Sequence, residues 1–350
     1  MIPDFSDGHR TSSATAFWSV VVAVAIGMIA TVTGPPPARQ AAAPGHGDVA
    51  TFGAIVDRVA RGEPYYEATG AELRAGGYPT AQVFNWRTPL LLSGIAASPV
   101  AARGAFLALG IGVAFLTIVL LRPLTVAMVG GVMQLGMLLV FAVPTAIFMA
   151  EVWAGALIAL SLCAYIRSRP LTGALVGLSA LFVRELAAPY CAGCAVAAVV
   201  NRRWSEAVAW LTGLLLYAGY LAWHVTAVWS HQLPTDVAHT ASWLQFGGLG
   251  FVLTIVATHV WLVMQPLPVI VAALMLVVAG IASRNTPMPI RIASATYLLF
   301  FLAVGQSFNT YWAYLVWPTW SLASGFGAHE LLQGIRHVTQ HLRPLVSRPR

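Results

Sequence analysis

Pro44–Pro89 reads PGHGDVATFGAIVDRVARGEPYYEATGAELRAGGYPTAQVFNWRTP, a long polar segment between apolar ones. It contains five of the twelve acidic residues of the chain: Asp48, Asp57, Glu63, Glu67 and Glu72. Functional side chains concentrate in loops that a rigid scaffold positions, and membrane helices form such a scaffold. We therefore expect this segment to do the chemistry and the apolar remainder to hold it in place.

The composition predicts an all-α polytopic integral membrane protein. Of the 350 residues, 58% are hydrophobic and only 9% are charged, whereas a soluble domain has roughly 25% charged residues. At about 20 residues per helix, the chain has room for roughly ten transmembrane helices. The long apolar runs replace the alternation expected of a membrane β-barrel, which excludes that class.

The net charge of +7 comes entirely from arginine, because the sequence contains no lysine. Much of this charge lies in short loops and the C-terminal tail, where the positive-inside rule expects it, so nucleic acid is not an implied partner. Cys191 and Cys194 have CxxC spacing but lack the second ligand pair of a zinc site, and we expect them to be packing residues. The alanine- and arginine-rich composition is typical of GC-rich bacterial genomes.

We predict a single membrane domain over residues 1–350. It comprises a cytoplasmic N-terminus (1–14), a first span (15–33), an outer loop (34–88), a helical bundle (89–328) and a cytoplasmic basic tail (329–350). Within the loop, Phe52, Ile55 and Val56 recur at helical spacing opposite Asp57 and Arg58, which predicts an amphipathic helix lying in the membrane interface.

The bundle region divides into apolar segments that we expect to be helices. They are 90–98 (a short span), 105–121, 126–143, 146–166, 171–183, 187–200, 207–229, 249–264, 269–281, 292–305 and 314–327. Arg167, Arg169, Arg202 and Arg203 mark the cytoplasmic side. If every segment crosses once, the loop with Arg284 falls outside, so either one segment between 247 and 281 is re-entrant or the count is wrong.

Several short motifs in the chain resemble those of the GT-C superfamily of polytopic glycosyltransferases, which use polyprenyl-phosphate-linked sugars. An early loop aspartate follows the first span, and an Arg-Glu pair lies in the middle of the chain. The motifs are Asp48, Gly62-Glu-Pro-Tyr65, Tyr78-Pro79, Thr88-Pro-Leu-Leu91, Leu181-Phe-Val-Arg184-Glu185 and the aromatic stretch Asn309–Pro318. The chain departs from the commoner pattern because no second proline follows Tyr78-Pro79.

The resemblance implies an inverting glycosyltransferase on the outer face of a bacterial inner membrane. Asp48 would be the base that deprotonates the acceptor hydroxyl, and Arg184 would bind the donor phosphate through its bidentate fork. The substrates would be a polyprenyl-phosphate sugar from among the membrane lipids and a glycan, lipid or protein acceptor. No cofactor is expected, since no Rossmann fingerprint occurs, and no carboxylate pair has the spacing that would imply a metal.

Supporting roles are open for five further residues: His46, Glu151, Glu185, Asp236 and Tyr65. His46 is close to Asp48 in sequence, and Asp236 lies in a second outer loop with His239. Each has a structural alternative. Asp48 could cap a helix, Arg184-Glu185 could join two helices, Glu151 could snorkel at a helix end, and Tyr65 could be an interface aromatic.

Two other classes of protein fit the same composition. A transporter or flippase of lipid-linked glycans would also contain an intramembrane arginine, although transporters often show internal repeats and none is evident here. A non-catalytic membrane scaffold is the third possibility. Sugar transfer from a lipid-linked donor separates the enzyme from both.

Overall fold

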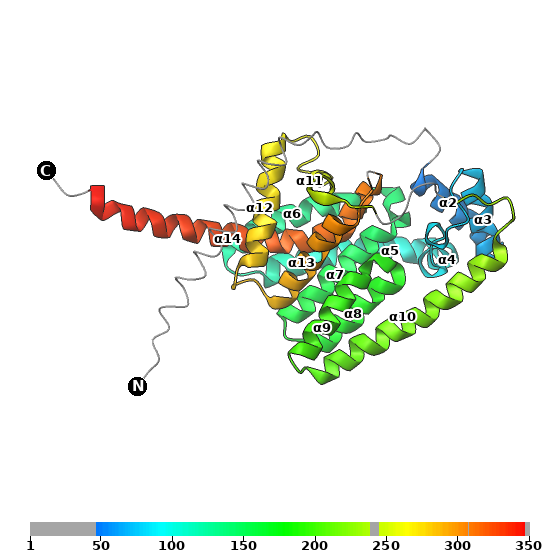
Figure 1. The fold of residues 1–350 in the computed structure, drawn as a ribbon, viewed down its shortest axis with the longest axis horizontal. Helices are drawn as coiled ribbons and strands as arrows, with labels where there is room; N and C mark the ends of the chain where they lie inside the picture. The colour runs from blue at the N-terminus through cyan, green and yellow to red at the C-terminus, as the bar shows by residue number, and fades with distance from the viewer. Residues whose placement is uncertain (1–46, 239–244, 307, 347–350) are drawn as a thin grey trace.

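A computed structural model describes residues 47–238, 245–306 and 308–346 of the chain, with side chains placed up to residue 337. The predicted first span (15–33), His46 and His239 lie outside the described residues. Figure 1 shows that the described parts are helical, and they contain no strand. The predicted all-α class is therefore confirmed for this part of the chain.

The acid-rich segment folds into two helices, α2 (Asp48–Ala60) and α3 (Tyr65–Ala75), followed by a short 3-10 turn, η1 (Val83–Asn85). Gly62 makes the turn between α2 and α3 with a positive φ of 95°. Arg58 fastens the two helices together, with guanidinium nitrogens 2.6 Å from Glu63 and 3.0 Å from Glu72. The segment is thus a folded cap rather than an extended loop.

The apolar face of α2 is covered by protein. Phe52, Ile55 and Val56 are buried, and α2 packs against α4 (Pro89–Ala97) and the 3-10 turn η2 (Pro144–Phe148). The predicted amphipathic helix is confirmed. The prediction that its apolar face lies in the membrane interface is wrong for this structure, because the bundle itself supplies the apolar partner.

The segment predicted at 90–98, as a short span or part of one, is too short to cross a membrane by itself. The helix there, α4, has 9 residues, which gives a length of about 13 Å against a hydrocarbon core of about 30 Å. It packs against α2 and α5 at one end of the bundle. Proline at its start and Pro99 at the start of the next helix set its bounds.

Within the part of the chain that the structure describes, three helices are long and apolar enough to cross a membrane: α5 (Pro99–Leu120), α6 (Leu124–Ala142) and α10 (Trp204–His231). Their apolar side chains face outward, with Ile111 and Phe115 on α5 at 65% and 63% exposure and Leu215 on α10 at 74%. Such a surface in water would be an extended apolar patch, whereas lipid solvates it without cost. The chain therefore has the surface of a membrane protein, and the finer prediction of roughly ten spans is not established.

The other helices are shorter apolar segments that pack around one another. Their bounds follow the predicted segments closely, except that the segment predicted at 249–264 is helical only to Ala257. They are α7 (Ala150–Ile166), α8 (Pro170–Val183), η3 (Glu185–Ala187), α9 (Ala188–Val200), α11 (Gly248–Ala257), α12 (Leu267–Ala282), α13 (Met288–Ala303) and η4 (Asn309–Trp312).

The helix α14 (Ala313–Val346) runs through the centre of the bundle and then projects from it (Figure 1). Its first half is fully buried, with Trp317 and Trp320 at 0% exposure, and it packs against α6, α7 and α12. Gly280 of α12 and Gly327 of α14 let the two backbones approach so closely that any Cβ atom would meet a carbonyl group. The predicted basic tail at 329–350 begins as a continuation of this helix.

The two ends of the bundle differ in their charges. Glu151 begins α7 and Arg184 ends α8 at one end, while Arg167 and Arg169 connect the same helices at the other. The loop containing Arg284 lies at the arginine end, because the preceding residue, Ser283, hydrogen-bonds Glu330 near the exit of α14 at 2.8 Å. The predicted segments placed Arg284 outside if every one of them crossed the membrane. The helix α11 is only about 15 Å long, too short to cross a bilayer, and without that crossing Arg284 lies on the same side as the other loop arginines.

The close contact between α12 and α14 predicts a position-specific effect of alanine. Gly327→Ala should lower thermal stability, because overpacking against a backbone carbonyl typically costs about 1–3 kcal/mol. Gly334→Ala is the matched control on the same helix, where an added Cβ meets nothing within 4 Å. It should be neutral or slightly stabilising. Thermal unfolding of detergent-solubilised protein measures both, and equal effects would contradict the described packing.

Candidate functional site

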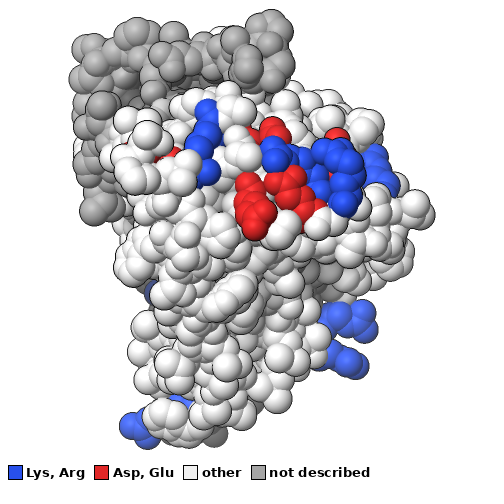
Figure 2. All heavy atoms as spheres, turned by 90° about the vertical axis from the view of Figure 1, so that its right-hand side faces the viewer, with Lys and Arg blue, Asp and Glu red and all other residues white. Residues whose placement is uncertain are grey.

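Acidic and basic side chains gather on the face formed by α2, α3 and the end of α10. Figure 2 shows them as one mixed patch above a broad uncharged surface. Asp48 begins α2, Arg87 lies between η1 and α4, and Glu151 begins α7. The structure thus brings together residues that are distant in sequence at one end of the bundle.

Four of these side chains form a buried charge cluster: Arg87, Glu151, Arg184 and Glu185. Arg184 Nε lies 2.7 Å from Glu151 Oε1, and Arg184 Nη1 contacts Glu185 Oε1. Arg87 nitrogens lie 3.7 Å from Glu151 and 3.8 Å from Glu185. The two positive and two negative charges cancel, which is the condition under which buried charges are tolerated. We call this set the charge cluster.

The pairing of Arg184 with Glu185 depends on a break in the chain. Consecutive residues of one helix point about 100° apart, but α8 ends at Val183 and Arg184 is extended, with φ −150° and ψ 119°. Pro189 in the first turn of α9 favours this interruption. Arg184 then lies at the C-terminal end of α8 and Glu151 in the first turn of α7, and both placements suit the helix dipoles.

The Arg184 side chain is only 4% exposed and paired with two carboxylates, so it does not face an open cavity. Glu151 is likewise 4% exposed and bound to Arg184, which rules out the alternative that it snorkels at a helix end. An isolated charge in an apolar bundle has a high free-energy cost. Here the opposite charges of Arg184 and Glu151 neutralise each other, which lowers that cost.

Arg87 is the member that the sequence did not identify. The Arg87 side chain is 13% exposed, and its guanidinium carbon lies 5.3 Å from the centre of the Phe52 ring. Its guanidinium has five N–H donors in principle, and none forms a hydrogen bond to a described residue. One feature of the sequence could have identified it: Arg87 stands directly before an apolar run. Arg184 also lies next to apolar segments, where a charge is energetically unfavourable.

Asp48 occupies the first position of α2, and its side chain does not cap the helix. The residue at the N-cap is Gly47, without a side-chain hydrogen bond. The Tyr78 hydroxyl instead donates to Asp48 Oδ1 at 2.8 Å. Burial raises the pKa of Tyr78, and the Asp48 charge raises it further, so the phenol stays protonated as a donor. Arg87 lies at the same end of the bundle, between η1 and α4.

Aromatic side chains hold the backbone of this loop in place. The Tyr65 hydroxyl donates to the Arg87 carbonyl at 2.7 Å, and His224 Nε2 lies 3.1 Å from the Trp86 carbonyl. Tyr66 contacts the other ring nitrogen of His224 at 2.9 Å. Trp86 is 2% exposed, so its ring is covered by protein and does not lie at a surface. The aromatic residues support Arg87 from behind.

Asp236 does not join Asp48 and the charge cluster. Its carboxylate forms a two-point pair with Arg74 of α3, at 2.7 and 2.9 Å, and accepts from the Leu233 backbone at 3.0 Å. The Arg74 guanidinium holds the pKa of Asp236 well below its usual value. Asp236 therefore fastens α3 to the segment after α10, which keeps the cap closed over the bundle.

Comparison with protein-family models, with curated proteins and with solved structures found no match to this chain. The resemblance to the GT-C superfamily therefore rests on the motifs alone. Among the described residues, no group of three or more His, Cys, Asp and Glu side chains is arranged to hold a metal ion. The site is defined by its carboxylates, arginines and aromatic residues.

The charge cluster predicts strong coupling between Arg184 and Glu151. Arg184→Met should destabilise the protein by about 3–5 kcal/mol, because it leaves a buried carboxylate without its nearest counter-charge. The double variant Arg184→Met/Glu151→Leu restores neutrality and should be more stable than the single variant. Thermal unfolding measures the cycle. Additive losses would show that the two side chains do not depend on each other.

The pair Arg74–Asp236 predicts a pH-dependent contribution to stability. A depressed pKa in the folded state means that the contribution is present above the usual value of 3.8 and is lost as the pH falls through the lower folded-state value. Asp236→Asn should cost about 1–3 kcal/mol at pH 7. The difference from wild type should narrow below about pH 4. A difference that is constant with pH would exclude the ionised pair as its source.

Proposed function

We propose that this chain is a membrane glycosyltransferase that transfers a sugar from a polyprenyl-phosphate donor to an outer-face acceptor, with a GT-C-like architecture. The observation that supports it best is the placement of Asp48 and Arg87 at the same end of the bundle. A half-buried carboxylate, held by Tyr78, lies at the end that also has a guanidinium whose donors are not hydrogen-bonded to described residues. Transfer from a lipid phosphate requires such a base and such a cation.

In this proposal, Asp48 accepts the proton of the acceptor hydroxyl as its oxygen attacks the anomeric carbon of the donor. The bond between that carbon and the phosphate oxygen breaks, and the electron pair leaves with polyprenyl phosphate. Direct displacement inverts the anomeric centre. Tyr78 holds Asp48 through its hydrogen bond of 2.8 Å, which fixes the carboxylate before substrate arrives.

Arg87 is assigned the contact with the departing phosphate, in place of Arg184. A guanidinium matches phosphate geometry through two parallel N–H donors and stays charged in an apolar setting. Arg184 already contacts Glu151 and Glu185, so its role is to hold the two carboxylates that position Arg87. When the donor binds, Arg87 replaces its long ion pairs with Glu151 (3.7 Å) and Glu185 (3.8 Å) by a contact with the phosphate.

The proposal also fixes the orientation in the membrane. The arginines between α7 and α8, between α9 and α10 and between α12 and α13 lie at the end opposite the charge cluster. The positive-inside rule assigns that end to the cytoplasm of a bacterial inner membrane. Asp48 and Arg87 then face outward, where a lipid-linked donor is needed because nucleotide sugars are cytoplasmic.

The test uses the full-length chain in nanodiscs with a panel of polyprenyl-phosphate sugars and short glycan acceptors. Asp48→Asn should lower turnover by about 10²- to 10⁴-fold, as expected for loss of a general base. Arg87→Lys should lower it by about 10-fold or more through loss of the fork. Asp57→Asn is the matched control, since this exposed carboxylate lies on the same helix.

Folded Asp48→Asn protein that keeps more than half the wild-type turnover would exclude Asp48 as the base. Failure of the wild-type protein to transfer any sugar of the panel would reject the glycosyltransferase. Movement of the lipid-linked sugar across vesicle membranes without transfer would then identify the rival transporter.

A further inference from the structure

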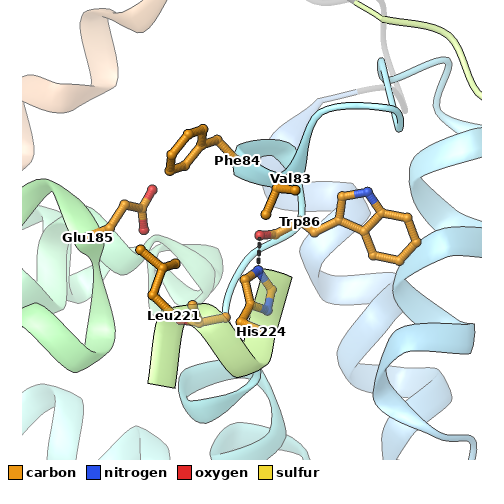
Figure 3. A pocket seen from close by; sticks show the side chains of 7 residues that line it. Val83, Phe84, Trp86, Glu185, Leu221 and His224 are labelled. Atoms are coloured by element: carbon orange, nitrogen blue, oxygen red, sulfur yellow. Dashed lines mark hydrogen bonds between the residues drawn. The ribbon is translucent and has the colours of Figure 1, made fainter. Parts of the chain in front are cut away.

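A small open pocket lies beside the charge cluster, between η1, η3 and α10. It is a shallow hollow rather than an enclosed cavity, since its roughly 200 Å³ of empty space includes open solvent. Its lining consists of Val83, Phe84, Trp86, Thr88, Glu185, Leu221 and His224. Figure 3 shows the Glu185 carboxylate and the Phe84 ring facing the same space, with Leu221 and His224 on its other side. Asp48 is not among the residues of the lining.

The Glu185 carboxylate presents one engaged and one available oxygen. Oε1 is the atom that contacts both Arg184 and Arg87, whereas Oε2 makes no hydrogen bond to the side chain of a described residue. The side chain is 21% exposed, the most of any member of the charge cluster. Because the arginines neutralise its charge, the pocket does not select a cation. The available oxygen instead suits a hydroxyl donor.

Apart from Thr88 and His224, the rest of the lining is apolar. Phe84 is 55% exposed, an unusual exposure for a phenylalanine ring beside a carboxylate. His224 serves as a wall, since both of its ring nitrogens are occupied by Tyr66 and the Trp86 carbonyl. A ligand must therefore offer an apolar face to Phe84 and Leu221 and a hydroxyl to Glu185. A sugar ring has both, with C–H groups on one face and hydroxyls at its edge.

We propose that this pocket binds one sugar unit of the acceptor, held between Phe84 and Glu185. The inference rests on the proposed glycosyltransferase function and deepens it. Because Asp48 lies outside the lining, the bound unit is a neighbour of the one whose hydroxyl reacts. The acceptor is then a glycan of at least two units, rather than a lipid or protein that carries no sugar.

Binding of methyl glycosides and their disaccharides to the full-length protein in detergent tests this pocket directly, by saturation-transfer NMR. We expect millimolar affinity, about 1–10 mM, for at least one disaccharide. Leu221→Trp fills the pocket, leaves all four residues of the charge cluster in the sequence and should weaken that affinity at least about tenfold. Leu216→Trp is the matched control, because this residue of the same helix is 64% exposed. Phe84→Ala should also weaken binding.

The proposal is overturned if no saccharide of the panel binds, or if the Leu221→Trp and Leu216→Trp proteins bind equally well. Tighter binding of ethanolamine than of any saccharide would also overturn it, since that would show a cation site. The sugar-transfer assay distinguishes failure of the pocket proposal from failure of the proposed glycosyltransferase function. Sugar transfer to an acceptor without sugar units, unaffected by Leu221→Trp, would leave the glycosyltransferase standing and remove the acceptor pocket.

Discussion

The arrangement of the whole site depends on the mutual neutralisation of four buried charges. Glu151 and Arg184 come from facing ends of α7 and α8, and Arg87 arrives from the cap. None of these groups is tolerable alone in an apolar bundle, so each can be buried only if the others are present. The cluster therefore fixes where the cap docks, and the cap in turn places Asp48 and Tyr78.

Helix positions followed well from the sequence because apolar runs and prolines fix them locally. Pro99, Pro170 and Pro189 each stand at the start of a helix, where proline is tolerated. Which of these helices cross the membrane was harder to predict from the sequence. The apolar runs that became α4 and α11 look like membrane segments by composition, but their helices are too short, because length is set by turns that composition does not reveal.

The site was only half predictable for a related reason. Asp48, Glu151, Arg184 and Glu185 stood out because charge is rare in this chain, and the structure does bring them to one end. Their partners did not stand out, since pairing across 33 residues, as between Glu151 and Arg184, is a property of the fold. Trp86 and Tyr65 resembled interface aromatics because an indole or phenol that binds a backbone carbonyl has the same sequence signature as one that meets headgroups.

The central position of α14 has a consequence for how the protein is made. Chains are synthesised from the N-terminus, so α5 to α13 emerge before the helix around which α6, α7 and α12 pack. Until then, the side of α12 at Gly280 lacks the backbone that it packs against. The bundle consequently closes only after α14 has been made. A ribosome that stops short of Ala313 releases a chain in which α6, α7 and α12 have lost their shared partner.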